Sequence, residues 1–139
     1  MKYLKTFKLI SLDLLEEGNE EIVVTNIPLL DGLIIDREDE KSQWVLEGVL
    51  DRSYQRYFEK FKKKNEQLML QAKITKESNQ PATFMCSIMG INEMDDHINI
   101  LFIGNLIDRK KGQIERTLKL LIDEGFQGEE LLDEFKDRV

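Results

Sequence analysis

Hydrophobic and polar residues alternate along most of residues 1–107, as expected of strands that bury one face. The pattern is strongest over 81–107, PATFMCSIMGINEMDDHINILFIGNLI, where the polar link Asn92–Asp96 separates two apolar halves. This run predicts a β-hairpin that completes the β part of the fold. The positions that share one face are Phe84, Cys86 and Ile88 in the first half, and Ile98, Ile100, Phe102 and Leu106 in the second.

Further strands are predicted before this hairpin. In 3–15 the apolar parity changes near Leu9–Ile10, which predicts either a β-bulge or burial of both faces. Pro28 cannot donate a ladder hydrogen bond and is expected at a strand end or a sheet edge. Asp31–Gly32 is the strongest tight-turn dipeptide in the chain and predicts a turn. The predicted segments are 3–15, 21–27, 33–35, 43–51 and 66–76.

Segment 66–76 alternates most regularly. Its apolar members are expected to face inward and its polar members outward. The inward set is Leu68, Leu70, Ala72 and Ile74, and the outward set is Gln67, Gln71, Lys73 and Thr75.

The period changes to that of a helix in two places. Within 53–63 an aromatic stripe follows i, i+3, i+4 and i+7 spacing, which predicts a helix. Its N-cap is Asp51 or Ser53, and lysines lie at its C-terminal end, where the helix dipole favours cations. Two further stripes predict a helical hairpin over 110–138, whose first helix ends at Gly125. These stripes are Tyr54, Tyr57, Phe58 and Phe61; Ile114, Leu118, Leu121 and Ile122; and Leu131, Leu132 and Phe135.

Together these elements predict an α+β fold that is mainly antiparallel β. About seven strands form a strongly bent sheet or a small β-barrel, and a C-terminal helical hairpin packs against it. Closure would protect long apolar strands from exposed edges. We expect one domain over 1–139, comprising a β-rich body over 1–107 with a short helix near 53–63, followed by the helical hairpin 110–138.

Composition narrows the class of protein. The net charge of −7 disfavours a dedicated nucleic-acid binder, which needs a surplus of Lys and Arg against phosphates. The single cysteine excludes an intramolecular disulfide and fits a reducing compartment. No apolar run reaches the roughly 18 residues of a membrane span. The chain is therefore expected to be cytoplasmic, without a membrane span.

Two stretches carry chemically reactive side chains. Asp95–Asp96–His97 places carboxylates beside an imidazole, which suits a metal site or a general base, but consecutive side chains diverge and a turn is the favoured interpretation. Cys86 lies in the middle of a predicted strand, which favours a buried, unreactive thiol. No catalytic residue, cofactor or metal ligand is predicted.

One basic and aromatic cluster is a candidate binding patch. On a barrel-like scaffold its rings could stack on bases while its cations contact phosphates. The favoured alternative is an amphipathic helix whose lysines complement the helix dipole. The patch comprises Tyr54, Arg56, Tyr57, Lys60, Lys62, Lys63 and Lys64.

Several separate segments, in order along the whole chain, together resemble the YwpF-like family of Gram-positive bacteria. The resemblance implies a small cytoplasmic protein of bacilli or staphylococci. It brings no established activity, cofactor or catalytic motif. The segments are KTFKLISLDLL, LLDGLIID, DRSYQRYFEKF, NQPATF, DDHINILFIGNLI and EGFQGEELLDEFK.

Three functions follow as hypotheses. The leading one is a non-enzymatic protein that binds a protein partner or self-associates through its β-barrel surface and helical hairpin. The second is a nucleic-acid or anionic-ligand binding module that uses Tyr54–Lys64. The third is a hydrolase whose active-site residues are dispersed along the chain.

Overall fold

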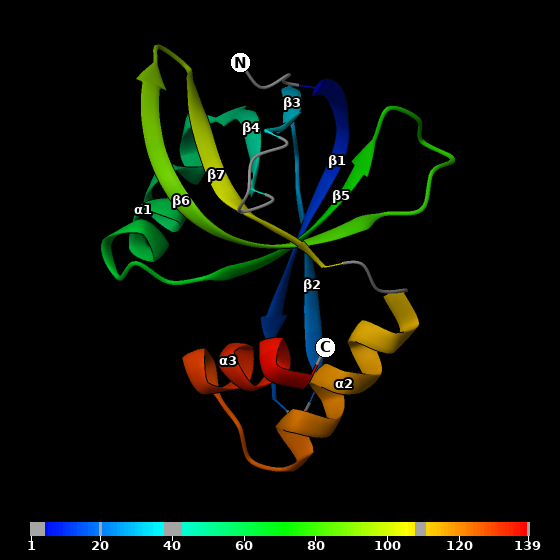
Figure 1. The fold of residues 1–139 in the computed structure, drawn as a ribbon. Coiled ribbons are helices and arrows are strands. Elements are labelled where there is room, and N and C mark those ends of the chain that lie inside the picture. Colours follow the sequence, from blue (N-terminus) through cyan, green and yellow to red (C-terminus); the bar gives the residue numbers. More distant parts are fainter. Residues whose placement is uncertain (1–4, 20, 38–42, 108–110, 139) are drawn as a thin grey trace.

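The computed structural model describes residues 5–19, 21–37, 43–107 and 111–138, and Figure 1 shows a β-rich body with helices α2 and α3 beneath it. Residues 3, 4 and 110 of the predicted elements lie outside the described part. The strands are β1 (Lys5–Glu17), β2 (Ile22–Ile27), β3 (Asp31–Asp36), β4 (Gln43–Asp51), β5 (Leu68–Ile74), β6 (Ala82–Met94) and β7 (His97–Ile107). The helices are α1 (Gln55–Lys63), α2 (Lys111–Asp123) and α3 (Gly128–Arg138), with a 3₁₀ turn at Arg52–Tyr54.

The sheet closes on itself. Its strand order is β2-β1-β3-β4-β7-β6-β5, and an additional pairing of β1 with β5 joins the two ends. Among the described residues, six strands therefore form a barrel, β2 is an extra strand beside β1, and every pairing is antiparallel. This confirms the predicted α+β fold, and of the two predicted forms, bent sheet or small barrel, the barrel is the one observed.

Strand β1 holds the closure together because it pairs with three strands. Its register against β5 shifts between Leu9 and Ser11, which is the predicted bulge. The bulge lets Leu9 and Leu12 both point into the barrel core although their parities differ. Leu15, near the other end of the strand, belongs to a second core outside the barrel, so β1 is covered on both faces near its C-terminal end.

The predicted turn at Asp31–Gly32 is wrong. Both residues open β3 and pair with Val49 and Gly48 of β4. Strands β2 and β3 run in the same direction along β1. Residues 28–30 connect them and belong to neither strand. Gly32 is needed for packing instead, since a Cβ there would lie 2.9 Å from the Cβ of Leu9.

The barrel interior is apolar and one helix closes it. Asp51 caps the 3₁₀ turn by accepting a hydrogen bond from the Ser53 backbone N–H at 2.9 Å, as predicted for one of the two candidate caps. Phe58 of α1 is fully buried in the barrel core, and its ring meets Phe102 edge-on at 6.0 Å between centroids. The predicted aromatic stripe is therefore confirmed as the face that packs on the barrel.

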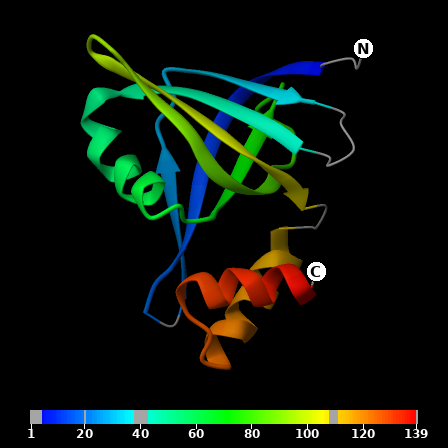
Figure 2. The same ribbon diagram turned by 60° about the vertical axis from the view of Figure 1, so that its left-hand side comes forward.

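The C-terminal helical hairpin packs on the outside of the barrel (Figure 2). Helix α2 ends in a Schellman motif: Gly125 has φ +97°, its N–H donates to Ile122 O, and the Phe126 N–H donates to Leu121 O. Leu131 and Phe135 of α3 join the second core. The fully buried residues that the barrel contributes to this core are Leu15, Met69 and Met85, which face outward from β1, β5 and β6, and Ile107 of β7 packs beside them.

The outward set predicted for β5 needs one correction. Gln71 is 2% exposed rather than solvated, and its Nε2 donates to the equally buried Thr83 Oγ1 at 3.4 Å. Of the inward set, Leu68, Leu70 and Ala72 are buried in the barrel core, and Ile74 is half-buried and packs against it.

Candidate functional site

The basic and aromatic patch predicted from the sequence lies on α1 and its flanks. Its aromatic rings face the protein. Tyr54 and Tyr57 are half-buried against the barrel core, and Tyr57 packs edge-on against both Phe58 and Phe61. These rings are engaged in packing, so the stacking surface that base binding requires is reduced.

The cations of the same patch point to solvent. Arg56, Lys62 and Lys63 are exposed. The Lys60 ammonium lies 5.4 Å from the centroid of the Tyr57 ring, and Lys64 Nζ lies 3.9 Å from a Glu66 carboxylate oxygen. The last turn of α1 is therefore cationic, the arrangement that its dipole favours.

Tyr57 links α1 to β1 through a polar contact. Its hydroxyl donates to Glu16 Oε1 at 2.7 Å. Burial, together with this hydrogen bond and the negative charge of Glu16, raises the pKa of the Tyr57 hydroxyl above its ordinary value of 10. The phenol is consequently held in its neutral form.

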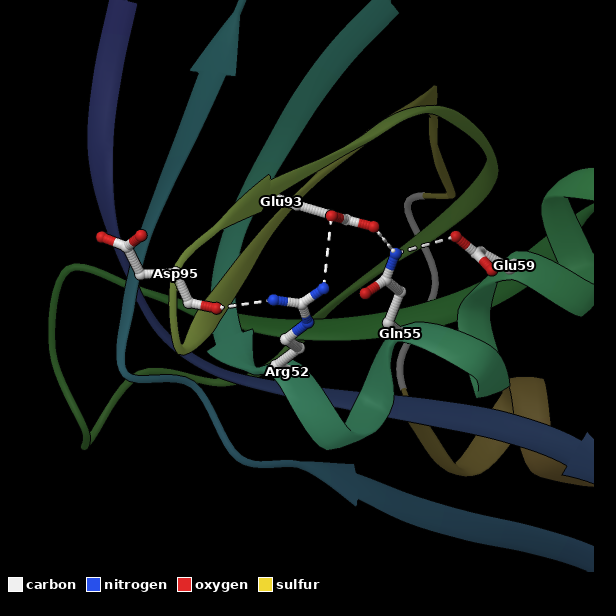
Figure 3. Close-up of polar contacts among 5 residues, drawn as sticks. All are labelled: Arg52, Gln55, Glu59, Glu93 and Asp95. Carbon is white, nitrogen blue, oxygen red and sulfur yellow. Dashed lines mark hydrogen bonds and ion pairs between the residues drawn. The ribbon is translucent and has the colours of Figure 1, made fainter.

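Asp95 and Asp96 form the turn between β6 and β7, and His97 is the first residue of β7, which agrees with the favoured turn interpretation. Figure 3 shows how Arg52 and Gln55 hold this turn: Arg52 Nη1 donates to Asp95 O at 3.1 Å and Arg52 Nη2 contacts Glu93 Oε2 at 3.3 Å. Gln55 Nε2 donates to both Glu93 and Glu59. These exposed contacts fasten the turn to the start of α1.

Cys86 lies inside the barrel at 1% exposure, as predicted. Burial raises the pKa of its thiol to about 12, which leaves a protonated, weakly nucleophilic sulfur at neutral pH. Cys86 pairs with Gly104 whereas His97 pairs with Met94, so the two residues sit at different places along the β6–β7 hairpin.

The described residues also bear on two other kinds of site, metal centres and membrane spans. No group of three or more His, Cys, Asp or Glu side chains among them is arranged to hold a metal ion. None of the helices in the described part is long and apolar enough to cross a membrane.

A groove that no sequence pattern indicated opens where the barrel meets the helical hairpin. We call it the seam groove. It has a volume of about 320 Å³ and lies between the end of β1, the end of α1, the start of β5 and the start of α3. Its apolar floor consists of Leu14, Leu15, Phe61, Leu68, Met69 and Leu132.

The rim of the seam groove is acidic. Glu16 accepts the Tyr57 hydrogen bond, and Glu17 Oε2 accepts one from the Gly128 backbone N–H at 2.9 Å, which caps α3. Glu66 and Glu129 also line it. A smaller hollow of about 120 Å³ adjoins it and adds Asp133, so the rim favours a cationic partner.

The seam groove could not be predicted from the sequence because its lining comes from four separate segments. The signal that existed was the position of carboxylates at the ends of elements: Glu16 and Glu17 close β1, and Glu129 lies in the first turn of α3, where the helix dipole alone already favours it. Their meaning depends on the docking of α3 near β1, and no local pattern encodes that docking.

Comparisons with known proteins agree with the fold and give the family. The family model described as YwpF-like protein matches residues 5–138. The chain is 32% identical over 136 residues to a protein named "Uncharacterized protein YwpF" from Bacillus subtilis (strain 168), covering 98% of this chain and 100% of that protein. The structure is similar to the crystal structure of a hypothetical protein from Staphylococcus aureus, with a TM-score of 0.69, 28% identity, and coverage of 98% of this chain and 91% of that one. The resemblance predicted from the sequence is thus confirmed: the chain belongs to the YwpF-like protein family.

Proposed function

We propose that this protein is a non-enzymatic binding protein whose binding surface is the seam groove. The observation that supports this proposal is the groove itself, a hollow of about 320 Å³ with an apolar floor and an acidic rim. Phe61 and Leu132 leave part of the floor in contact with water, and apolar surface exposed in this way forgoes about 25 cal/mol per Å² of stabilisation. A partner that covers the floor would gain that stabilisation.

The size of the groove favours an inserted side chain over a cofactor. Pockets for drug-sized ligands span ~300–1,000 Å³, and this groove lies at the lower end of that range. A protein partner needs only to insert one or two apolar side chains and to place cations against the rim. We therefore propose a protein as the partner.

The two alternative functions have less support. A hydrolase needs a poised acid, base or nucleophile, whereas Tyr57 and Cys86 both have pKa values raised toward neutral forms. A nucleic-acid module would need accessible rings near Lys60–Lys64, but Tyr54 and Tyr57 pack on the barrel. The buried thiol and the single cysteine in the sequence support our further proposal that the protein works in a reducing cytoplasm.

Site-specific photo-crosslinking tests the proposal. We would place p-benzoylphenylalanine at Glu129, which is exposed on the rim, and irradiate a native extract. We expect a discrete crosslinked protein species. The matched control is Met94, 42% exposed at the tip of β6–β7, at the other end of the barrel from the hairpin (Figure 1). No crosslink at Glu129, or the same species at Met94, would contradict the proposal.

A further inference from the structure

Strand β2 forms an open end of the sheet. It is the last strand in the strand order and pairs with β1 on one edge, and no strand among the described residues pairs with its other edge. The described linings of the seam groove and of the hollow beside it include no residue of β2. The free edge of β2 is therefore a second surface, separate from the groove, that offers backbone groups to a partner.

Half of the backbone groups of β2 point away from β1. The Gly18 N–H donates to Glu21 O at 2.7 Å, so these two residues form a hydrogen-bonded pair where the two strands meet. Hydrogen-bonded and non-hydrogen-bonded pairs alternate along an antiparallel ladder. The register therefore makes Ile22, Val24 and Asn26 non-hydrogen-bonded positions, whose N–H and C=O groups face the free edge.

Strand β2 lacks the features that protect an edge strand. Natural edges are blunted by charged residues, by proline, by bulges or by a covering element. The sequence of β2, IVVTNI, contains no charge and no proline, and its register with β1 is uninterrupted. Val23 and Val24 point to opposite faces of the strand, yet they are 45% and 47% exposed. Both faces of β2 are therefore open to water at its centre.

The second half of β6 shows how another edge of the same sheet is protected. Strand β5 pairs with β6 only as far as Cys86, so the edge of β6 beyond this residue has no strand beside it among the described residues. The ladder there is bulged between Ile88 and Gly90, and Gln55 of α1 donates a hydrogen bond to Glu93. This edge has a bulge, a charge and a covering helix, and the edge of β2 has none of them.

The other exposed apolar side chains of the described residues do not combine an apolar pair with an open edge. Met89 lies in the bulged part of β6, and Leu106 lies on β7, an interior strand of the sheet. Leu30 and Met94 each stand next to a carboxylate in the sequence. Leu120 belongs to a helix whose neighbouring positions carry both signs of charge.

The stretch of chain that contains β2 is acidic. Residues 9–36 include no Lys or Arg, and their carboxylates are Asp13, Glu16, Glu17, Glu20, Glu21, Asp31 and Asp36. Asp13, Glu16 and Glu17 lie opposite β2 on β1, and Glu21 directly precedes β2. No ion pair among the described residues involves these four carboxylates. Their negative charge is therefore not neutralised by a salt bridge within the described part of the chain.

Neighbouring elements do bring cations to this hairpin. Helix α1 contacts β1 through Tyr57, strand β5 pairs with β1, and helix α2 lies beside β2. The cations of these elements include Lys60 beside the Tyr57 ring, Lys73 in an ion pair with Glu77, and the exposed Arg116 and Lys119. None of them forms a described salt bridge with the hairpin, so its carboxylates stay open to cations of a partner.

We propose that the free edge of β2 binds an extended segment of a partner protein, which adds a strand to the sheet and carries Lys or Arg beside its apolar residues. Main-chain hydrogen bonds to a sheet edge provide affinity, and alternate side chains provide specificity. The added strand would cover Val23 on one face and Val24 on the other. A second copy of this chain fits less well, because it would bring a hairpin with the same sign of charge.

Three synthetic peptides test the partner's chemistry. The probe is a fluorescein-labelled peptide with the sequence KVTVTVK. One control is EVTVTVE, and the other is KVTVTVK with a methyl group on every central backbone nitrogen. Fluorescence anisotropy at about 50 mM salt should show binding of the probe with a Kd between about 10 µM and about 1 mM. Each control should bind at least roughly tenfold more weakly, because the first loses its cations and the second loses its backbone donors.

Variants of the chain test the location. Val24→Pro removes an N–H that faces the free edge without removing a donor to β1, so it should weaken binding of the probe roughly tenfold. Val24→Thr keeps the N–H and is the matched control. Glu21→Lys should weaken binding several-fold, whereas Asp96→Lys, the same charge change in the β6–β7 turn, should not. Circular dichroism of each variant shows whether it is folded.

Nuclear magnetic resonance of the isotope-labelled wild type gives a readout that needs no variant. Addition of the probe should shift the amide signals of Ile22, Val24 and Asn26 and slow their hydrogen exchange. Three outcomes would overturn the inference: no binding or equal binding of the three peptides, changes confined to other amides, or a wild-type chain that self-associates in sedimentation and stops doing so in Val24→Pro. The last outcome would make a second copy the occupant. None of them depends on the Glu129 crosslink, so the groove is tested separately.

Discussion

The backbone of β7 approaches β6 so closely at Gly104 that no side chain fits. A Cβ there would lie 2.0 Å from the Met85 carbonyl oxygen and 2.7 Å from the Cys86 Cα. These neighbours are backbone atoms in the middle of a ladder, so they cannot move aside without disturbing the barrel. Glycine inside a strand marks such an approach.

Gly104→Ala should therefore lower the free energy of unfolding by about 1–3 kcal/mol, the range for overpacking a well-packed interior. Urea denaturation followed by circular dichroism measures it. Gly90→Ala is the matched control, because a Cβ at Gly90 of β6 meets no atom within 4 Å. Equal effects of the two substitutions would contradict the explanation.

The Tyr57 hydroxyl predicts a dependence of stability on alkaline pH. Its folded pKa is raised, so above pH 10 the unfolded chain releases the proton while the folded chain retains it. The stability that this group contributes is complete below pH 10 and is lost as the pH rises toward the folded pKa.

Tyr57→Phe should lower the free energy of unfolding by about 1.5 kcal/mol at pH 7, since a hydrogen bond to a charged acceptor is removed. The difference from the wild type should shrink as the pH rises above about 10. Urea titrations at a series of pH values measure both effects. A difference that stays constant with pH would contradict the role assigned to the hydroxyl.

Among single elements, α1 combines an apolar face that packs on the barrel with a cationic C-terminal turn. Its apolar face closes the barrel through Phe58, and its last turn is cationic. Packing on the barrel and the helix dipole are each sufficient reason for these residues. The nucleic-acid hypothesis therefore makes a prediction that separates it from the structural explanation.

Replacing Lys60, Lys62, Lys63 and Lys64 with Gln should lower stability by only about 1 kcal/mol at low salt, through the dipole of α1. Fluorescence anisotropy with single-stranded DNA at about 50 mM salt, where exposed charges act over longer distances, should show no change in affinity. A nucleic-acid patch would instead give log K falling by about 0.7 per phosphate contact per log unit of salt. The variant with four Arg residues, which keeps the charge, is the control.

Helices and strands with a regular spacing of apolar residues were predictable from the sequence. The neighbours that each element packs against in the fold were not. The stripe around Phe58 and the alternation from Leu68 to Ile74 each mark an apolar face that packs into the barrel core, so the pattern alone locates them. Gln71 was misjudged because the outer face of β5 is covered too, and burial of a polar side chain is then allowed by its bond to Thr83. The dipeptide Asp31–Gly32 is a common turn signal, but the glycine here is required by close packing against Leu9. The two causes cannot be distinguished from the sequence.

At the scale of the whole molecule, the barrel core and the second core share strands. Leu14 points into the barrel and the adjacent Leu15 into the second core, and Leu70 and Met69 of β5 do the same. The seam groove arises at this junction, which is why local patterns could not reveal it.

This sharing supports our proposal that the chain is a single domain, and it predicts one cooperative unfolding transition. Urea curves from near-ultraviolet signals of Trp44 in the barrel and from the far-ultraviolet helix signal should coincide. Trp44 is a suitable probe because its ring packs against the Phe84 ring, with 5.6 Å between the two centroids. Met69→Ala should shift both curves together by about 2–5 kcal/mol, the range for truncating a large core side chain. Separate transitions would show that the hairpin unfolds on its own.

The pairing of β1 with β5 also bears on how fast the protein folds. During synthesis β2 and β3 follow β1 closely and can pair with one of its edges. The other edge of β1 stays unpaired until β5, which follows β4 and α1, has been made. Contacts such as Leu9 with Ile74 join distant parts of the chain, and closing such a long loop is entropically unfavourable until later contacts compensate. Proteins dominated by pairings of this kind fold in milliseconds to seconds rather than microseconds. Until β5 arrives, one edge of β1 is open to strands of other molecules, and a nascent chain stalled before Leu68 would be prone to aggregate.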